Sequence, residues 1–176
     1  AAGAVPLRGV VRPENRASER AFARAGFQPS QQVYDLLVYR ILGTVPRPLA
    51  PWGGDVHPLA GAEEAAALAA LAPGTLPASE PLCAAAHQPG LTVAVATQGG
   101  AVVGGVGLVE VQTLLYSGLW LEGLVTSRSR RQPLAALAAW AVEAAKARGL
   151  DSAGCLAPHE QPVLRQTLLA EGYRLL

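Results

Sequence analysis

The sequence predicts an α/β fold in which a mixed β-sheet carries helices on its faces. Short β-rich apolar runs alternate with segments whose apolar residues recur at helical spacing, and this alternation is the basis of the prediction. Of the 176 residues, 51% are hydrophobic and 15% are charged, a composition that can build a buried core. The formal net charge is +1, so composition gives no reason to expect a nucleic-acid or membrane partner.

Strands and helices alternate through the second part of the chain. The Gln98-Gly99-Gly100 turn between two apolar runs is typical of a β-hairpin. The strongest helical pattern has Pro133 at its first position and ends at Gly149. We expect strands at 55–60, 92–97, 101–112, 118–127, 151–157 and from 173, and helices at 61–71, 133–149 and 160–172.

The N-terminal segment repeats part of this plan. A β-rich run at 5–11, a helical pattern within 13–27 and a β-branched and aromatic run at 28–42 predict strand, helix and strand. Residues 44–54 are rich in proline and glycine, which is typical of a linker. We therefore divide the chain into a segment at 1–43, a linker at 44–54 and a domain at 55–176.

Residues 13–27 and 159–173 also share one pattern: a polar opening, a helix of matched length and a final Gly-aromatic pair. Their separation is the length of a domain, which favours tandem copies of one unit over a short-period solenoid. The alternative is that any amphipathic helix ending in Gly-aromatic would look the same.

The run from Asn15-Arg16-Ala17-Ser18 to Gly26-Phe27 resembles the last helix of the GNAT acyltransferase superfamily. With Pro13-Glu14 and the strand at 34–40, it is most similar to the branch that acetylates the N-termini of ribosomal proteins. The resemblance implies that residues 1–43 are the C-terminal strand-helix-strand remnant of a first GNAT copy. The second part resembles the same superfamily over about 120 residues, and the resemblance implies the GNAT fold. In that family two further strands follow the last helix. Here one is expected, so we hypothesise that the N-terminal segment lies against this sheet, in the same chain or across a dimer.

The segment after the strand at 118–127 resembles the coenzyme-binding loop and helix of the family. The N–H groups at a helix N-terminus attract pyrophosphate, and Arg128, Arg130 and Arg131 place cations just before this helix. The alternative is a solvated basic loop. The resemblance implies acetyl-coenzyme A as cosubstrate, bound by Leu124, Val125, Ser127, Arg128, Arg130, Arg131, Gln132, Leu134 and Ala135.

Glu122 fits the position of a general base in many members of the family, which would take a proton from the attacking ammonium group. It could equally be an exposed strand carboxylate. Glu110 and His159 are weaker candidates for the base. Cys155 could be a nucleophile, but direct transfer needs none, so we expect it to pack in the core. The histidines and cysteines show no metal-ligand spacing, and we expect no metal site.

Three residues depart from the family pattern. Pro133 stands where the family loop has glycine and removes one backbone N–H. Gln161 replaces the usual opening asparagine of the last helix, and Leu168 replaces a tyrosine that protonates the departing thiolate in many members. Leucine cannot supply that proton.

We therefore expect an N-acetyltransferase that moves an acetyl group directly from acetyl-coenzyme A to an unknown amine. The alternative, which the three departures favour, is a catalytically degenerate module with a structural or regulatory role and a binding partner. A nucleotide-binding α/β domain is a third possibility, but Gly104–Gly107 lies within a strand and is more typical of a β-bulge. No signal peptide or long apolar run is visible, so we expect a cytoplasmic protein without nucleic-acid or membrane partners. A homodimer is one arrangement that we consider.

Overall fold

The computed structural model describes residues 11–29, 32–42, 52–71, 90–112, 117–127 and 130–176. The chain forms two compact units, Ala1–Val33 and Tyr34–Leu176, which are described separately. The expected strand at 5–11 and Arg128 lie outside the described residues.

The N-terminal unit contains helix α1 (Arg16–Arg24), which confirms the expected helix. Asn15 caps it, because its side-chain oxygen accepts a hydrogen bond from the backbone N–H of Ser18 at 3.1 Å. The helix ends at Arg24, and Gly26 follows the C-cap with a φ of 86°, which suits glycine. The rings of Phe22 and Phe27 then meet edge to face, with centroids 4.9 Å apart.

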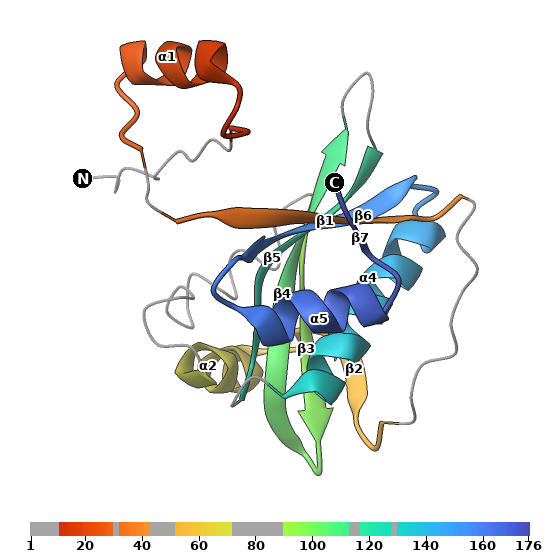
Figure 1. The fold of residues 1–176 in the computed structure, drawn as a ribbon. Coiled ribbons are helices and arrows are strands. Elements are labelled where there is room, and N and C mark those ends of the chain that lie inside the picture. Colours follow the sequence, from red (N-terminus) through yellow and green to blue (C-terminus); the bar gives the residue numbers. More distant parts are fainter. Residues whose placement is uncertain (1–10, 30–31, 43–51, 72–89, 113–116, 128–129) are drawn as a thin grey trace. The chain divides into compact units, whose positions relative to one another are not determined.

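The larger unit is built on a seven-stranded mixed sheet in the order β2-β3-β4-β5-β6-β1-β7 (Figure 1). The β5–β6 pair is parallel, and the other neighbouring strands are antiparallel. The predicted mixed α/β fold is therefore confirmed. The strands are β1 (Tyr34–Arg40), β2 (Asp55–Pro58), β3 (Leu91–Gln98), β4 (Ala101–Gln112), β5 (Ser117–Thr126), β6 (Ser152–Pro158) and β7 (Arg174–Leu175).

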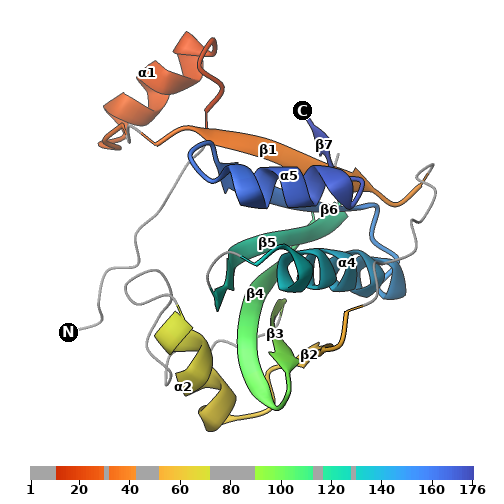
Figure 2. The ribbon, with the colours of Figure 1, turned by 60° about the horizontal axis from the view of Figure 1, so that its bottom comes forward.

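Helices cover both faces of this sheet. Helices α4 (Arg131–Ala147) and α5 (Pro162–Ala170) pack against each other and over one face, and α2 (Ala62–Leu71) packs over the other (Figure 2). Strand β3 shows the division, because successive side chains point to opposite faces. Its Ala94 and Ala96 join the core with α4 and α5, whereas Val93 and Val95 pack with Leu68 of α2.

Strand β1 comes from the N-terminal part of the chain but lies inside the larger unit. It pairs with β6 from Tyr34↔Pro158 to Arg40↔Ser152, and with β7 at Leu37↔Leu175. This confirms, within one chain, the hypothesis that the N-terminal segment adds a strand to the sheet. The compact units accordingly divide after Val33, earlier than the linker at 44–54. The reason is physical: Leu37 is fully buried only when this strand joins the core.

Helices α1 and α5 end in the same geometry. Gly26 and Gly172 have φ values of 86° and 94°, and the next residue donates its N–H to the carbonyl five residues back: Phe27 to Phe22 at 3.1 Å, and Tyr173 to Leu168 at 3.0 Å. The sequence pattern that suggested tandem copies therefore has a structural counterpart. That residues 1–43 are the remnant of a first copy stays a prediction.

Helix α4 begins two residues earlier than its sequence pattern predicted. Arg130 is the N-cap and Arg131 the first helical residue, so Pro133 occupies the third position, where it is buried. A proline there is tolerated because the N–H groups of the first turn have no partner within the helix. At the other end, the helix stops before Gly149, with a φ of 68°.

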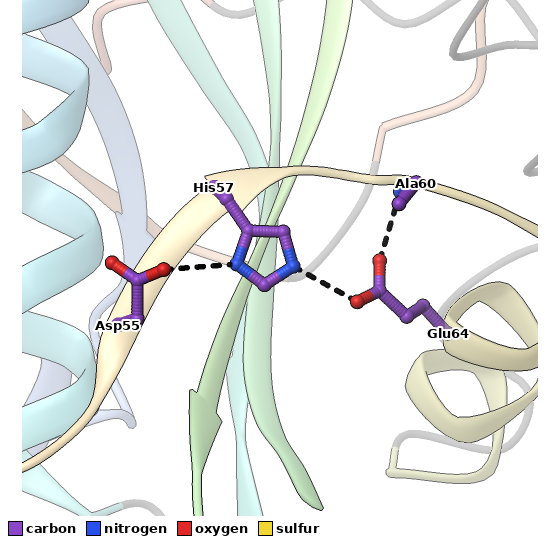
Figure 3. Close-up of polar contacts among 4 residues, drawn as sticks. All are labelled: Asp55, His57, Ala60 and Glu64. Carbon is purple, nitrogen blue, oxygen red and sulfur yellow. Dashed lines mark hydrogen bonds and ion pairs between the residues drawn. The ribbon is translucent and has the colours of Figure 1, made fainter. Parts of the chain in front are cut away.

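Edge strand β2 is tied to α2 by a histidine between two carboxylates (Figure 3). Nε2 of His57 lies 2.8 Å from Oε1 of Glu64, and Nδ1 lies 3.5 Å from Oδ2 of Asp55. The second oxygen of Glu64 accepts the backbone N–H of Ala60 at 2.8 Å. These contacts fix the start of α2 against the sheet edge.

Candidate functional site

The candidate site is a gap between the parallel strands β5 and β6. Their pairing begins at Gly118↔Ser152 and ends at Leu121↔Cys155. Beyond that point β5 continues alongside β4 to Thr126, and β6 continues alongside β1 to Pro158. The strands thus diverge, and backbone groups of residues 122–126 face a partner strand on one side only. Such an edge can accept an extended ligand as an added strand.

A β-bulge in β5 directly follows the point of divergence. Gly107 pairs with Glu122 and Gly105 with Val125, so Gly123 and Leu124 lie opposite the single residue Val106. Gly123 has a φ of 60°, a conformation that favours glycine. The predicted irregularity at Gly104–Gly107 is confirmed by this register shift.

The bulge also changes which face each side chain takes. Leu124 packs against the core under α4, whereas the next residue, Val125, packs with Leu68 under α2. Glu122 is exposed on the rim of a groove together with Trp120. The side chains of Leu124 and Val125 are therefore fixed by packing on both faces, which leaves the backbone between them to line the gap.

The N-terminus of α4 follows β5 directly. Arg130 and Arg131 are exposed, and Arg131 donates from Nη2 to Oε1 of Gln166 on α5 at 3.0 Å. Among the described residues, Arg130 forms no ion pair. The N–H of Leu134 donates to the carbonyl of Arg130 at 3.4 Å, and the Leu134 side chain is buried. Both contacts stabilise the start of the helix. The unpartnered N–H groups of this turn are those before Pro133.

The remaining coenzyme candidates lie near this turn. Ser127 is half-buried just after β5, Gln132 is exposed, and Ala135 is half-buried on the first turn of α4. The structure thus brings the described candidates together at the end of β5 and the start of α4, as their closeness in the sequence implies. These groups suit a phosphate-bearing ligand. Helix N–H groups and two guanidinium groups, which bind phosphate, lie at the mouth of a gap that has an unpaired strand edge.

Two weaker candidates for the base are engaged elsewhere. The carboxylate of Glu110 accepts a hydrogen bond from Gln112 at 2.7 Å and lies 3.7 Å from Arg148. Nδ1 of His159 lies 3.3 Å from Oδ2 of Asp35. Glu122 is the carboxylate on the strand that borders the gap.

Cys155 is buried in the core beside the end of the parallel pairing. Burial, with a smaller contribution from the negative charge of Glu122, raises the pKa of its thiol to about 12. A thiol with that pKa is protonated at neutral pH and is a poor nucleophile. This agrees with the expected packing role.

The departures noted in the sequence have clear structural positions. Leu168 is fully buried in the core, so its side chain is remote from any proton-transfer role. Gln161 is the N-cap of α5, but its side chain makes no capping hydrogen bond, unlike Asn15 in α1. The hydroxyl of Tyr173 is also committed, since it donates to the carbonyl of Ala138 at 3.1 Å.

Solved structures with the same architecture include acetyltransferases. A GCN5-related N-acetyltransferase from Kribbella flavida aligns with a TM-score of 0.56 at 21% identity, over 82% of this chain and 56% of that one. An aminoglycoside acetyltransferase from an uncultured soil metagenomic sample, solved with sisomicin, aligns with a TM-score of 0.59 at 16% identity, over 68% and 88% of the two chains. The fold is that of the GNAT acetyltransferases.

A similar fold also occurs in a protein that is named as a transcriptional regulator. A transcriptional regulator from Bacillus halodurans aligns with a TM-score of 0.59 at 20% identity, over 69% of this chain and 93% of that one. No family model matches the sequence, and no curated protein matches it. At these identities the GNAT likeness concerns the fold, and function rests on the site.

Two further observations concern metal-ligand groups and membrane-spanning helices. No group of three or more potential metal ligands occurs within the part of the chain that the structure describes. None of its described helices is both long and apolar enough to cross a membrane.

Sequence reasoning missed the residues that β1 brings to the site. Arg40 and Val38 line the groove beside Trp120 and Glu122, although they are about 80 residues away along the chain. The β-branched and aromatic residues of 34–40 indicated a strand. It carried no information on which strand it would pair with, because pairing depends on contacts with β6 and β7.

Proposed function

We propose that the larger unit is a GNAT-type N-acetyltransferase that moves an acetyl group from acetyl-coenzyme A directly to an amine. The observation that carries this proposal is the gap that opens between β5 and β6 after Leu121↔Cys155, with the N-terminus of α4 at its end. An extended thioester needs such an unpaired strand edge, and its phosphates need such a helix end.

In this proposal the backbone of residues 122–126 hydrogen-bonds the extended arm of the coenzyme. The pyrophosphate lies at the N–H groups of Arg131 and Gln132, with Arg130 and Arg131 neutralising its charge. Ser127 lies at the end of β5 beside this site, Ala135 provides a small surface next to the phosphates, and Arg128 is proposed from the sequence as a further cation for the phosphates. Leu124, Val125 and Leu134 hold this backbone in place through their packing.

Transfer then needs one proton removed before the carbon–nitrogen bond forms. Glu122, or a water molecule that it orders, takes a proton from the ammonium group of the acceptor. The free amine attacks the thioester carbonyl, the developing oxyanion accepts a hydrogen bond from a strand N–H near Val125, and the carbon–sulfur bond breaks. The nitrogen of the adduct releases its second proton to water as the amide forms, and, because Leu168 cannot donate, the departing thiolate takes its proton from water.

A second candidate function is a catalytically degenerate module that binds a partner. It is favoured by Pro133, which removes an N–H from the phosphate-binding turn, and by the burial of Leu168. A hydrogen bond to a charged group is worth roughly 1.5–3 kcal/mol, so losing one N–H would weaken coenzyme binding about tenfold or more.

Calorimetric titration of the whole chain with acetyl-coenzyme A separates the two functions. The transferase proposal expects micromolar binding that is lost in Arg130→Ala and retained in Arg174→Ala, a matched removal of an exposed arginine on β7. Absence of binding at millimolar coenzyme would contradict the transferase proposal and favour the degenerate module.

We also infer that residues 1–43 derive from another GNAT copy, related to the branch that acetylates ribosomal-protein N-termini. The matched endings of α1 and α5 support this origin. We also propose that the protein acts in the cytoplasm and forms a homodimer.

A further inference from the structure

A groove of about 810 Å³ runs along the sheet face opposite α4. Leu37 and Tyr39 of β1 point into the core with α4, so the alternate residues Leu36, Val38 and Arg40 point to the other face. These three line the groove. On β4 and β5 the same face presents Val109, Val111, Trp120 and Glu122.

The charges in the groove lie at its two ends. Glu122 borders the gap at one end. Asp151 marks the other end, because its Oδ2 accepts a hydrogen bond at 2.6 Å from Oγ of Ser117, the first residue of β5. Arg40 lies at the same end, since it pairs with Ser152. Glu122 lies five positions after Ser117 on β5, which corresponds to roughly 16 Å.

These ends differ in net charge. The positive charge of Arg40 and the negative charge of Asp151 balance one another at the far end, whereas Glu122 is the one charged side chain among the described residues that line the groove at the end beside the gap. Between the ends, the lining side chains are apolar: Leu36, Val38, Val109, Val111 and Trp120. The groove therefore has a place for one cation and a long apolar surface for what carries it.

We propose that the acceptor is a monoamine with an elongated, uncharged apolar body. This inference rests on the proposed function, because it places the amine at Glu122 and the body along Trp120 toward Arg40. Each methylene buried in the groove is expected to tighten binding by about fourfold. A polyamine or aminoglycoside of similar length would place further cations against apolar side chains, where they lose hydration without gaining a partner.

The test compares 4-phenylbutylamine, spermidine and sisomicin as ligands of the whole chain by calorimetry, and as acceptors with acetyl-coenzyme A. The expected result is at least tenfold tighter binding and higher kcat/KM for 4-phenylbutylamine than for either polycation. Trp120→Ala is expected to weaken 4-phenylbutylamine binding at least tenfold. Trp140→Ala, on α4 across the sheet, is the matched control and should leave it within about twofold, since its indole lies outside the groove.

The outcomes separate this inference from the proposed function. If acetyl-coenzyme A binds and spermidine or sisomicin is bound or acetylated as well as 4-phenylbutylamine, the acceptor class is overturned and the transferase stands. If acetyl-coenzyme A does not bind, the transferase proposal fails. The affinity of the chain for 4-phenylbutylamine, measured without coenzyme, then still tests whether the groove holds an apolar amine. Should Trp120→Ala not fold, Val109→Thr keeps the shape of the groove wall and adds a hydroxyl. An unchanged affinity in that variant overturns the placement.

Discussion

Asp35 of β1 and Arg165 of α5 form a charge pair that joins the inserted strand to the last helix. Oδ2 of Asp35 lies 3.1 Å from Nε of Arg165, and the Asp35 side chain is 14% exposed. Neither atom has an aligned hydrogen-bond partner within the described residues, so attraction between the charges is the main contribution. Nδ1 of His159 lies 3.3 Å from the same oxygen.

Replacing Arg165 with leucine leaves the Asp35 carboxylate largely buried beside α5, with His159 as its remaining ion-pair partner among the described residues. We expect Arg165→Leu to lower the free energy of unfolding by about 1–3 kcal/mol, measured by urea denaturation. Lys146→Ala removes the pair that Lys146 forms with Glu143 on the surface of α4, and this control should cost less than about 1 kcal/mol. A double-mutant cycle with Asp35→Asn should give a clear coupling energy; independent effects would show that β1 is held by its hydrogen bonds and core contacts alone.

Glu122→Gln should separate binding from catalysis. The amide keeps the shape of the side chain but cannot take a proton, so we expect kcat to fall by about 10²–10⁴ with the acetyl-coenzyme A affinity unchanged. Steady-state kinetics with a responsive amine, together with calorimetry, measures both quantities. A fall of less than about threefold would mean that Glu122 is an exposed strand carboxylate without a catalytic role.

Pro133→Ala should restore the N–H that the turn at the start of α4 lacks. We expect acetyl-coenzyme A to bind up to about tenfold more tightly, because a charge-assisted hydrogen bond becomes available to phosphate. We also expect a small loss of stability, because the Pro133 ring is buried in the first turn of α4. Calorimetry and thermal unfolding together report both effects. Unaltered affinity in a folded variant would place the phosphates away from this turn.

Cys155 should be inert in the folded protein. Its thiol is buried and its pKa is raised to about 12, so a thiol reagent at pH 8 should modify it only after unfolding. A Cys83→Ala background leaves Cys155 as the single thiol to be followed. Cys155→Ala should retain acetyl transfer. Rapid labelling of the native chain, or loss of transfer in a folded Cys155→Ala variant, would overturn the packing role.

Glu64 should make the β2–α2 contact sensitive to acid. The hydrogen bond from the N–H of Ala60, followed by that of His57, lowers the pKa of Glu64. Because the folded-state pKa lies below the unfolded value, the carboxylate stabilises the fold above the unfolded pKa, and this stabilisation is lost as the pH falls through the folded pKa.

Glu64→Gln should therefore cost about 1 kcal/mol at neutral pH and flatten the acid side of the stability profile. Urea unfolding at several pH values between neutral and mildly acidic measures the slope. Glu63→Gln, on the exposed side of α2, is the matched control. Equal slopes in the two variants would show that the contact in Figure 3 does not contribute to the acid response.

Much of the fold follows from local patterns in the sequence. The expected strand at 101–112 coincides with β4, and the Gln98-Gly99-Gly100 turn is confirmed by positive φ values at Gly99 and Gly100. These features depend on neighbouring residues, because hairpin turns and strand alternation are set over a few positions. The start of α4 was placed two residues late, because proline suits more than one position in the first turn.

The candidate site was predictable only in part. The closeness of Glu122, Arg130 and Arg131 along the chain placed them together at the end of one strand and the start of one helix. The bulge at Gly123 and the separation of β5 from β6 could not be located from the sequence, because both depend on how far each strand pairs with its neighbours.

Local sequence patterns were sufficient to predict the main helices and strands of the larger unit, and to place arginines at the start of α4 after a β-rich strand. The position of β1 between β6 and β7, the groove that Arg40 and Val38 share with Trp120, and the Asp35–Arg165 pair depend on the tertiary structure. Local preferences act over one or two turns of chain. Strand order and facing side chains instead result from burying one common core, which involves residues far apart in the sequence.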